Sequence, residues 1–243
     1  MKPIAAIIVP YFNELQRFNA TYFDSIESHD NIQIYFVDDG STDGTEEILM
    51  SRYQNSPNVK MIGYDKNLGK AHAVKYGFTQ VLKQSKDCKL IIGFIDFDSS
   101  IDPKELIVII RNFQVQVEIG AANSVWAVRK KKKENRVVRK LSRHIIGRII
   151  HQILKLKIRD IPCDTQCGLK LFDRKSADIF TKIQFQTRWL FEIEFLKYIN
   201  SNSIPLVITE YELNYWREIS GSKVTTIKNI KNILDDLRAI FKT

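Results

Sequence analysis

Two acidic clusters stand where apolar runs of the sequence end. Asp96-Phe97-Asp98 directly follows the apolar run at 90–95. Carboxylates inside a strand would be costly to bury unless they were paired or bound to metal, so we expect them at the strand's exit. Two carboxylates there are hard oxygen ligands, suited to Mg²⁺ or Mn²⁺ bridging a diphosphate. The alternative is a helix cap, because Ser99, Ser100 and Asp102 precede Pro103.

The second cluster is Asp38-Asp39, which follows the apolar run at 32–37 and opens a loop ending at Thr45. A strand-to-helix loop with good capping chemistry accounts for the residues at 40–43. It does not account for two adjacent acids at the end of a buried strand. Such carboxylates accept hydrogen bonds from a nucleobase imide or a ribose hydroxyl, which distinguishes a nucleotide site from a bare phosphate site.

The elements that must position these acids alternate along the first half of the chain. Short β-like runs are predicted at Ile4 to Val9, Ile32 to Val37, Val59 to Tyr64 and Leu90 to Ile95. Helical patterns are predicted at Asn19 to Ser28, Thr45 to Gln54, Lys70 to Gln84 and Pro103 to Phe113. This alternation is typical of an α/β domain with a mostly parallel sheet flanked by helices. Ligands bind at the carboxyl ends of such strands, so the polar clusters at 11–14, 38–43, 66–70 and 96–100 should converge on one crevice.

Composition limits the protein to one globular domain. The chain has 243 residues, of which 44% are hydrophobic, enough for one substantial core. No apolar run approaches the ~20 residues that span a bilayer, and no signal-peptide cleavage pattern is present, so we expect a cytoplasmic protein. Cys88, Cys163 and Cys167 fit no disulfide framework or zinc spacing and are interpreted as ordinary buried thiols.

The net charge of +9 comes from one segment. Residues 129–159 are densely basic, whereas the rest of the chain is slightly acidic. Apolar residues recur through 137–154 at helical spacing, which indicates an amphipathic helix lying on an anionic membrane surface, or else packing on the core with solvated lysines. Nucleic-acid binding is disfavoured because the segment lacks interleaved aromatic residues.

Several strings of residues, in this order, resemble family 2 glycosyltransferases with the GT-A fold. They are Pro10-Tyr11-Phe12-Asn13-Glu14, Val37 to Thr45, Asn67 to Ala71 and Asp96-Phe97-Asp98. Further strings at 164–172, 188–194, 216–217 and 221–223 are similar to dolichyl-phosphate glucosyltransferases and their bacterial polyprenyl-phosphate relatives. The resemblance covers nearly the whole chain. It implies a Rossmann-like GT-A domain over residues 1–225, with a nucleotide-binding half at about 1–100, an acceptor-binding half at about 101–225, and an amphipathic helix at 226–243.

The resemblance also implies roles for individual residues. Those expected to bind the base, ribose and phosphates of the donor are Pro10, Phe12, Glu14, Asp38, Asp39, Lys70, Asp96 and Ser222. Asp96 and Asp98 would ligate Mg²⁺ or Mn²⁺, and Arg129, Arg217 and Lys223 would position the acceptor. The chain departs from the family pattern at Phe12, where tyrosine is usual, and at Ala127-Val128, where Gly-Ser is usual before the arginine.

The function implied is inverting transfer of a hexose, with UDP-glucose favoured, to polyprenyl or dolichyl phosphate at the inner face of the membrane. A lipid phosphate is already anionic and needs no strong base. The alternative acceptor is a hydroxyl of a cell-surface polysaccharide or lipid-linked glycan, and a carboxylate base is then needed. Asp164, Glu192 and Glu194 are the candidates for that base, although Glu192 and Glu194 also fit a solvent-facing helix or an ion pair with Arg188.

Overall fold

The computed structural model describes residues 2–129, 136–138, 158, 161–187, 190–217, 236, 237 and 240. In chain order the strands are β1 (Ala5–Tyr11), β2 (Ile32–Asp39), β3 (Val59–Tyr64), β4 (Ile91–Phe94), β5 (Ser124–Val128), β6 (Arg136–Val138), β7 (Lys170–Phe172), β8 (Ile208–Glu212) and β9 (Tyr215–Arg217). The helices are a short 3₁₀ turn η1 (Leu15–Arg17), α1 (Ala20–Glu27), α2 (Thr45–Tyr53), α3 (Lys70–Gln84), α4 (Pro103–Glu118), α6 (Arg174–Lys182) and α7 (Phe191–Ser201). The four strands and four helices expected up to residue 113 are confirmed.

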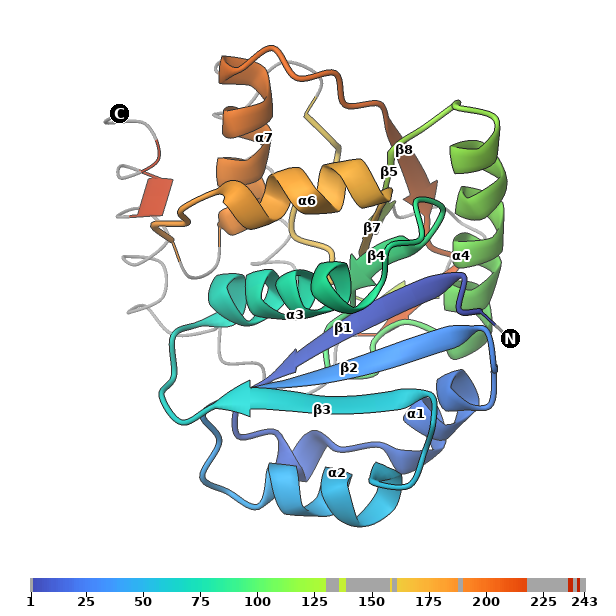
Figure 1. Cartoon of the computed structure of the whole chain (residues 1–243), viewed down its shortest axis with the longest axis vertical. Helices are drawn as coiled ribbons and strands as arrows, with labels where there is room; N and C mark the ends of the chain where they lie inside the picture. The colour runs from blue at the N-terminus through green and yellow to red at the C-terminus, as the bar shows by residue number, and fades with distance from the viewer. Residues whose placement is uncertain are drawn as a thin grey trace.

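One seven-stranded sheet runs through the domain in the order β3-β2-β1-β4-β7-β5-β8 (Figure 1). All its pairings are parallel except those that β7 makes with β4 and β5. The predicted mixed, mostly parallel sheet is therefore confirmed. Because strands from residues 1–100 and from residues 101–225 share this sheet, the two parts belong to a single domain. A second, two-stranded sheet pairs β6 with β9.

Helices cover both faces of the large sheet. One buried cluster joins α1, α2 and α4 to Ala5, Ile7 and Val9 of β1. A second cluster joins α3, α6 and α7 to Ala6 and Ile8 of the same strand. Burial on both faces explains why β1 reads as a continuous apolar run, since alternate side chains enter opposite cores.

Helix termini show which polar residues serve the fold. Asp102 caps α4, since its side chain accepts a hydrogen bond from the Lys104 amide, and Pro103 follows in the first turn. The cap of α2 is Gly44 at a φ of 88°, rather than a serine or threonine side chain. Asp43 contributes by accepting a 3.1 Å hydrogen bond from the Thr45 amide. The capping alternative for 96–102 therefore holds for Asp102 and leaves Asp96 and Asp98 unexplained.

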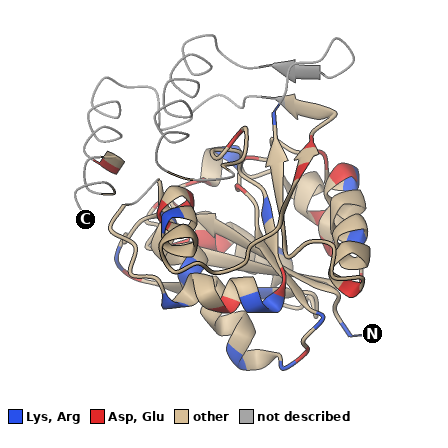
Figure 2. Ribbon diagram, turned by 90° about the horizontal axis from the view of Figure 1, so that it is seen from above, with Lys and Arg blue, Asp and Glu red and all other residues tan. Residues whose placement is uncertain are grey.

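Charge is mixed over the described surface. Acidic and basic residues are interspersed along the described ribbon (Figure 2). The helices α2, α4, α6 and α7 each carry both signs. Most of the basic segment 129–159 lies outside the described residues, so its membrane-surface interpretation stays a prediction. In the part of the chain that the structure describes, no helix combines the length and apolar character needed to cross a bilayer.

Candidate active site

Hydrogen bonds join the loop that follows β1 to the loop that follows β2. The Asn13 amide donates to Ser41 Oγ over 3.0 Å, and Asn13 Oδ1 accepts from the Thr42 amide over 2.8 Å. The Glu14 amide donates to Thr45 Oγ1 over 2.9 Å. Asn13 has a φ of 52°, in the left-handed region that asparagine tolerates better than most residues. The two polar clusters thus form one surface at the carboxyl edge of the sheet.

The residues predicted to hold the base and ribose border this surface: Pro10, Phe12, Glu14 and Asp38. Glu14 is buried and forms an ion pair with Arg17. Asp38 Oδ1 accepts from the amide and hydroxyl of Ser41, over 2.8 and 2.6 Å. Burial raises the pKa of Asp38, although the Ser41 hydrogen bonds oppose the rise. Nucleotide binding by these four residues stays a prediction.

Asp39 faces a different segment from its neighbour Asp38. Its carboxylate accepts from the amides of Leu68 (2.7 Å) and Gly69 (2.9 Å). It also accepts from Asn67 Nδ2 over 3.0 Å and from Tyr64 Oη over 2.9 Å. Asp39 therefore holds the loop that leads into α3, which fixes the position of Lys70 at the start of that helix.

An aromatic cluster orients the Asp96-Phe97-Asp98 turn. The Phe97 ring is buried, with ring centroids 5.1 Å from Phe23 and 5.7 Å from Tyr11. Such packing contributes beyond the burial of area alone, because edge and tilted ring contacts are favourable. With Phe97 committed to the α1 and α4 side of the sheet, the flanking carboxylates are held at the strand's exit.

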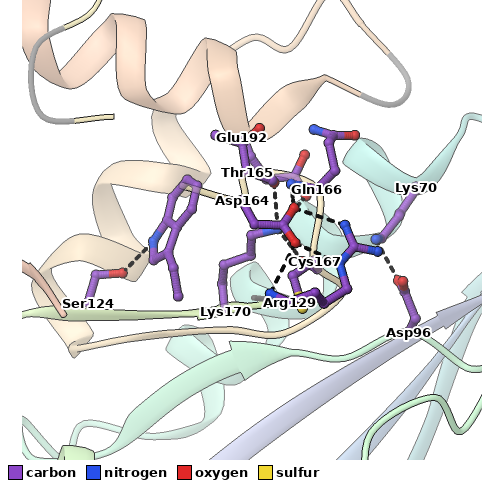
Figure 3. Close-up of polar contacts among 11 residues, drawn as sticks. Lys70, Asp96, Ser124, Arg129, Asp164, Thr165, Gln166, Cys167, Lys170 and Glu192 are labelled. Atoms are coloured by element: carbon purple, nitrogen blue, oxygen red, sulfur yellow. Dashed lines mark hydrogen bonds and ion pairs between the residues drawn. The ribbon is translucent and has the colours of Figure 1, made fainter. Parts of the chain in front are cut away.

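Lys70 and Asp96 form the central ion pair of the site. Lys70 Nζ lies 2.6 Å from Asp96 Oδ1 (Figure 3). It also lies over the rings of Phe94 and Phe191, at 5.2 and 5.8 Å from their centroids, within cation–π range. Burial alone would lower the pKa of Lys70, but the carboxylates of Asp96 and Glu192 outweigh it and raise that pKa. Burial likewise acts to raise the pKa of Asp96, but Lys70 outweighs it and lowers that pKa, so both groups remain charged.

Asp98 is the second carboxylate of the Asp96-Phe97-Asp98 turn. Its Oδ1 accepts a 3.1 Å hydrogen bond from the Ser100 amide. Burial first and the charge of Asp96 second raise the pKa of Asp98. Two carboxylates crowded at one strand end fit a divalent cation, which would relieve their repulsion and take further oxygens from a diphosphate. Among the described residues, no group of three or more His, Cys, Asp or Glu is placed to hold a metal ion, and metal binding by Asp96 and Asp98 stays a prediction.

Arg129 and Asp164 lie beside the Lys70–Asp96 pair (Figure 3). Arg129 follows β5, and its Nε and Nη2 donate to the two oxygens of Asp164 over 2.6 and 2.9 Å. The guanidinium also lies over the Trp216 ring, 5.0 Å from its centroid. Burial acts to lower the pKa of Arg129, but Asp164 outweighs it and raises that pKa. Both oxygens of Asp164, a candidate base, are thus engaged by a fixed cation.

The antiparallel strand β7 brings a distant loop against Asp96. Phe94 pairs with Lys170, so the residues preceding Lys170 run beside those that follow Phe94. The Asp96 amide donates to the Gly168 carbonyl over 3.1 Å. A Cβ at Gly168 would lie 2.1 Å from Asp96 Oδ2, closer than any real contact. A side chain at position 168 therefore requires the Asp96 carboxylate or the loop to move, and the 164–168 loop forms one wall around the carboxylate.

Lys170 and Glu192 form a second, buried ion pair that the sequence did not single out as a pair. Lys170 is 0% exposed and Glu192 is 4% exposed. Lys170 Nζ lies 3.0 Å from Glu192 Oε1 and donates to the carbonyls of Thr165 and Cys167. The alternative of a solvent-facing Glu192 is therefore excluded, since α7 turns this residue inward, and a role of Glu192 as a base stays a prediction. The sequence signal for this buried ion pair was a single lysine, Lys170, within the otherwise apolar run 169–172.

Glu194, the third candidate base, serves the local fold. Its two oxygens accept from the amides of Gln186 and Thr187, over 2.8 and 2.7 Å. The interpretation of all three cysteines as buried thiols holds only for Cys167, since Cys88 and Cys163 are exposed. None of the three cysteines forms a disulfide bond.

Some predicted residues lie beyond what the structure describes. Arg217 closes β9, but its side chain lies outside the described residues. Ser222, Lys223 and Arg188 lie outside them altogether, as does most of 226–243. Their predicted contacts with phosphate groups, and the C-terminal amphipathic helix, stay predictions.

Comparisons with known proteins agree with this geometry. The profile described as glycosyl transferase family 2 matches residues 6–180, from β1 to α6. The chain is 28% identical over 247 residues to a dolichyl-phosphate beta-glucosyltransferase of Dictyostelium discoideum, covering 96% of this chain and 72% of that protein. It is 27% identical over 235 residues to the Homo sapiens dolichyl-phosphate beta-glucosyltransferase, covering 90% of this chain and 69% of that protein.

A solved structure shows the same fold at low sequence identity. Glucosyl-3-phosphoglycerate synthase from Mycobacterium tuberculosis, in complex with Mn²⁺ and UDP-glucose, aligns with a TM-score of 0.66 and 16% identity. The alignment covers 97% of this chain and 78% of that one. The predicted GT-A fold is confirmed by this likeness.

Proposed function

Because the chain belongs to glycosyl transferase family 2, we propose that it moves a hexose from a nucleotide sugar, UDP-glucose being favoured, to polyprenyl or dolichyl phosphate at the cytoplasmic face of a membrane. The observation that carries the proposal is the Lys70–Asp96 pair at the carboxyl edge of the sheet, with Asp98 beside it and Arg129 on the adjoining wall. The relatives named as dolichyl-phosphate beta-glucosyltransferases support the choice of acceptor.

The donor lies across the strand ends in this proposal. Pro10, Phe12, Glu14 and Asp38 contact the base and ribose, and Asp39 acts through the 67–69 loop that it holds. Asp96 and Asp98 would hold Mg²⁺ or Mn²⁺, which when bound would supply Lewis-acid neutralisation of charge on the departing diphosphate. A neighbouring structure with Mn²⁺ and UDP-glucose supports this cofactor class.

The reaction is a single displacement at the anomeric carbon. A phosphate oxygen of the acceptor forms the new bond to C1 while the bond from C1 to the diphosphate oxygen breaks. The nucleoside diphosphate leaves, and the configuration at C1 of the transferred hexose is inverted. Lys70 stays protonated because Asp96 and Glu192 raise its pKa, so it offsets charge that develops on the leaving group. The acceptor oxygen is already anionic and needs no base.

Acceptor positioning falls to basic residues on the second half of the sheet. Arg129 is fixed by Asp164 and Trp216, and Arg217 and Lys223 are proposed to join it at the acceptor phosphate. Segment 129–159 would rest on the anionic lipid surface, where each basic residue contributes about 1 kcal/mol. No nucleic-acid role is proposed.

The direct test is a transfer assay with purified protein, labelled nucleotide sugars and two acceptor classes. Extraction of label into the organic phase with polyprenyl phosphate, strongest with UDP-glucose and absent with EDTA, is the expected result. Asp98→Asn should abolish it, whereas Asp87→Asn, at a half-buried acid in the loop between α3 and β4, should not. Turnover only with a glycan acceptor would reject the lipid-phosphate version in favour of transfer to a polysaccharide or lipid-linked glycan hydroxyl.

A further inference from the structure

A buried carboxylate oxygen beside the central ion pair has no hydrogen-bond partner in the described part of the chain. Glu192 Oε1 is held by Lys170 Nζ, whereas Oε2 is buried and lacks a partner among the described residues. Leaving a buried charged acceptor unsatisfied is unfavourable, and native proteins rarely do so without a ligand or water to complete it. Glu192 is 4% exposed, so this oxygen is not satisfied by bulk solvent.

A second unsatisfied group lies on the adjoining loop. Gln166 Nε2 is a buried donor without a partner among the described residues. Its backbone amide donates to Asp164 Oδ1 over 3.2 Å, which ties it to the Arg129 side of the site. Lys170 links the two groups, because it binds Glu192 and the carbonyls of Thr165 and Cys167, which flank Gln166.

Both groups belong to the wall around Asp96. Glu192 acts electrostatically on Lys70, whose ammonium contacts Asp96. Phe191, the residue before Glu192, lies under the same ammonium. Gly168, two residues after Gln166, is packed directly on the Asp96 carboxylate.

The chemistry of these atoms selects one kind of ligand. A free carboxylate oxygen repels phosphate, and an alkyl chain offers it no donor. A hydroxyl group donates to the carboxylate and accepts from an amide N–H, so a polyol satisfies both groups at once. A sugar hydroxyl can come from the donor hexose or from a glycan acceptor.

We infer that Glu192 Oε2 and Gln166 Nε2 bind hydroxyls of the donor hexose and so determine which sugar is transferred. The inference rests on the proposed function, since it assigns the sugar position of the same site. The donor is favoured over the acceptor as the source, because both groups lie on the wall that surrounds Asp96 and Lys70. Glu192 is then a binding residue for the sugar, with Lys170 as the positioning residue that orients it.

Calorimetric measurement of donor binding in the absence of acceptor tests the inference. The full chain is titrated in Mn²⁺ with UDP, with UDP-glucose and with the 2-, 3-, 4- and 6-deoxy analogues of UDP-glucose. The key variant is Glu192→Gln, whose amide oxygen keeps the Lys170 contact while its NH₂ replaces the free acceptor. Gln166→Leu removes the donor. Glu194→Gln is the matched control, since that carboxylate binds backbone amides of 186–187.

For the wild type we expect at least one deoxy analogue to bind about tenfold or more weakly than UDP-glucose, as expected for a lost hydrogen bond to a charged group. In Glu192→Gln that difference should shrink, because a neutral amide replaces the charged acceptor, while binding of UDP itself is unchanged. Gln166→Leu should erase discrimination at the same or a neighbouring hydroxyl. Glu194→Gln should keep the wild-type profile.

Parallel deoxy profiles in wild type and both variants would overturn the inference and leave the proposed function standing. Loss of discrimination only when a glycan acceptor is present would assign the two groups to the acceptor and also overturn it. A wild type that binds neither UDP nor UDP-glucose would instead reject the proposed function.

Discussion

Gly168→Ala should displace Asp96 although the substitution replaces no predicted ligand. The added Cβ would lie 2.1 Å from Asp96 Oδ2 and 2.4 Å from its Cγ. Van der Waals contact begins near 3.4 Å, so the carboxylate or the loop must move by about 1 Å. Lys70 holds the carboxylate on one side, and the Asp96 amide is bonded to the Gly168 carbonyl on the other.

Two magnitudes follow from that displacement. Overpacking of this kind costs roughly 1–3 kcal/mol of unfolding free energy. A misplacement of about 1 Å in a catalytic group costs on the order of 100-fold in rate. We therefore expect kcat for sugar transfer to fall by about two orders of magnitude, far more than the stability loss alone would produce in a protein that stays folded at assay temperature.

Gly120→Ala is the matched control for this substitution. Gly120 has a φ of 69°, and nothing lies within 4 Å of its added Cβ, so alanine there strains the backbone by roughly 1–2 kcal/mol without crowding a neighbour. Urea unfolding and steady-state kinetics of both variants separate the two effects. Wild-type kcat in Gly168→Ala, or an equal loss in Gly120→Ala, would refute the reasoning.

Two substitutions and one labelling experiment test other parts of the structure. Lys170→Met leaves the buried Glu192 carboxylate unpaired and should lower the unfolding free energy by about 3–5 kcal/mol in urea titrations. The double variant Lys170→Met/Glu192→Gln should recover part of that loss. Additive losses would contradict the pairing. Arg129→Lys loses the two-point contact to Asp164, and kcat/KM for the phosphate acceptor should fall about tenfold or more; an unchanged value would exclude Arg129 from acceptor positioning. Burial raises the pKa of Cys167 to about 11, so at pH 8 only about one Cys167 thiol in a thousand is ionised. Mass spectrometry after iodoacetamide treatment should find Cys88 and Cys163 alkylated and Cys167 protected until the chain unfolds. Early labelling of Cys167 would contradict its burial.

The first half of the fold was predictable because local patterns decide it. The strands β1, β2 and β4 are apolar runs buried on both faces, and α1 to α4 have helical periodicity, with polar side-chain caps at α1 and α4. Their ends follow from sequence alone, which places Asp38 and Asp96 at one edge of the sheet. The antiparallel β7 is three residues long and has too few positions to show a period.

The contacts that define the site depend on residues far apart in the chain, and local patterns do not encode them. Asp38 and Asp39 are adjacent acids, yet Asp39 binds the loop at 67–69 about 30 residues away. Glu192 reads equally well as a surface or a buried residue until β7 supplies Lys170. The close packing of Gly168 on Asp96 likewise becomes visible only when β7 pairs with β4.

Calorimetric binding of UDP with and without Mn²⁺ tests the central claim that Asp96 and Asp98 hold a cation against the donor diphosphate. We predict that UDP binds wild-type protein only when Mn²⁺ is present, and that Asp98→Asn loses this metal-dependent binding while keeping the wild-type melting temperature within a few degrees. Equal UDP affinity in EDTA, or unchanged Mn²⁺-dependent binding in Asp98→Asn, would contradict the account.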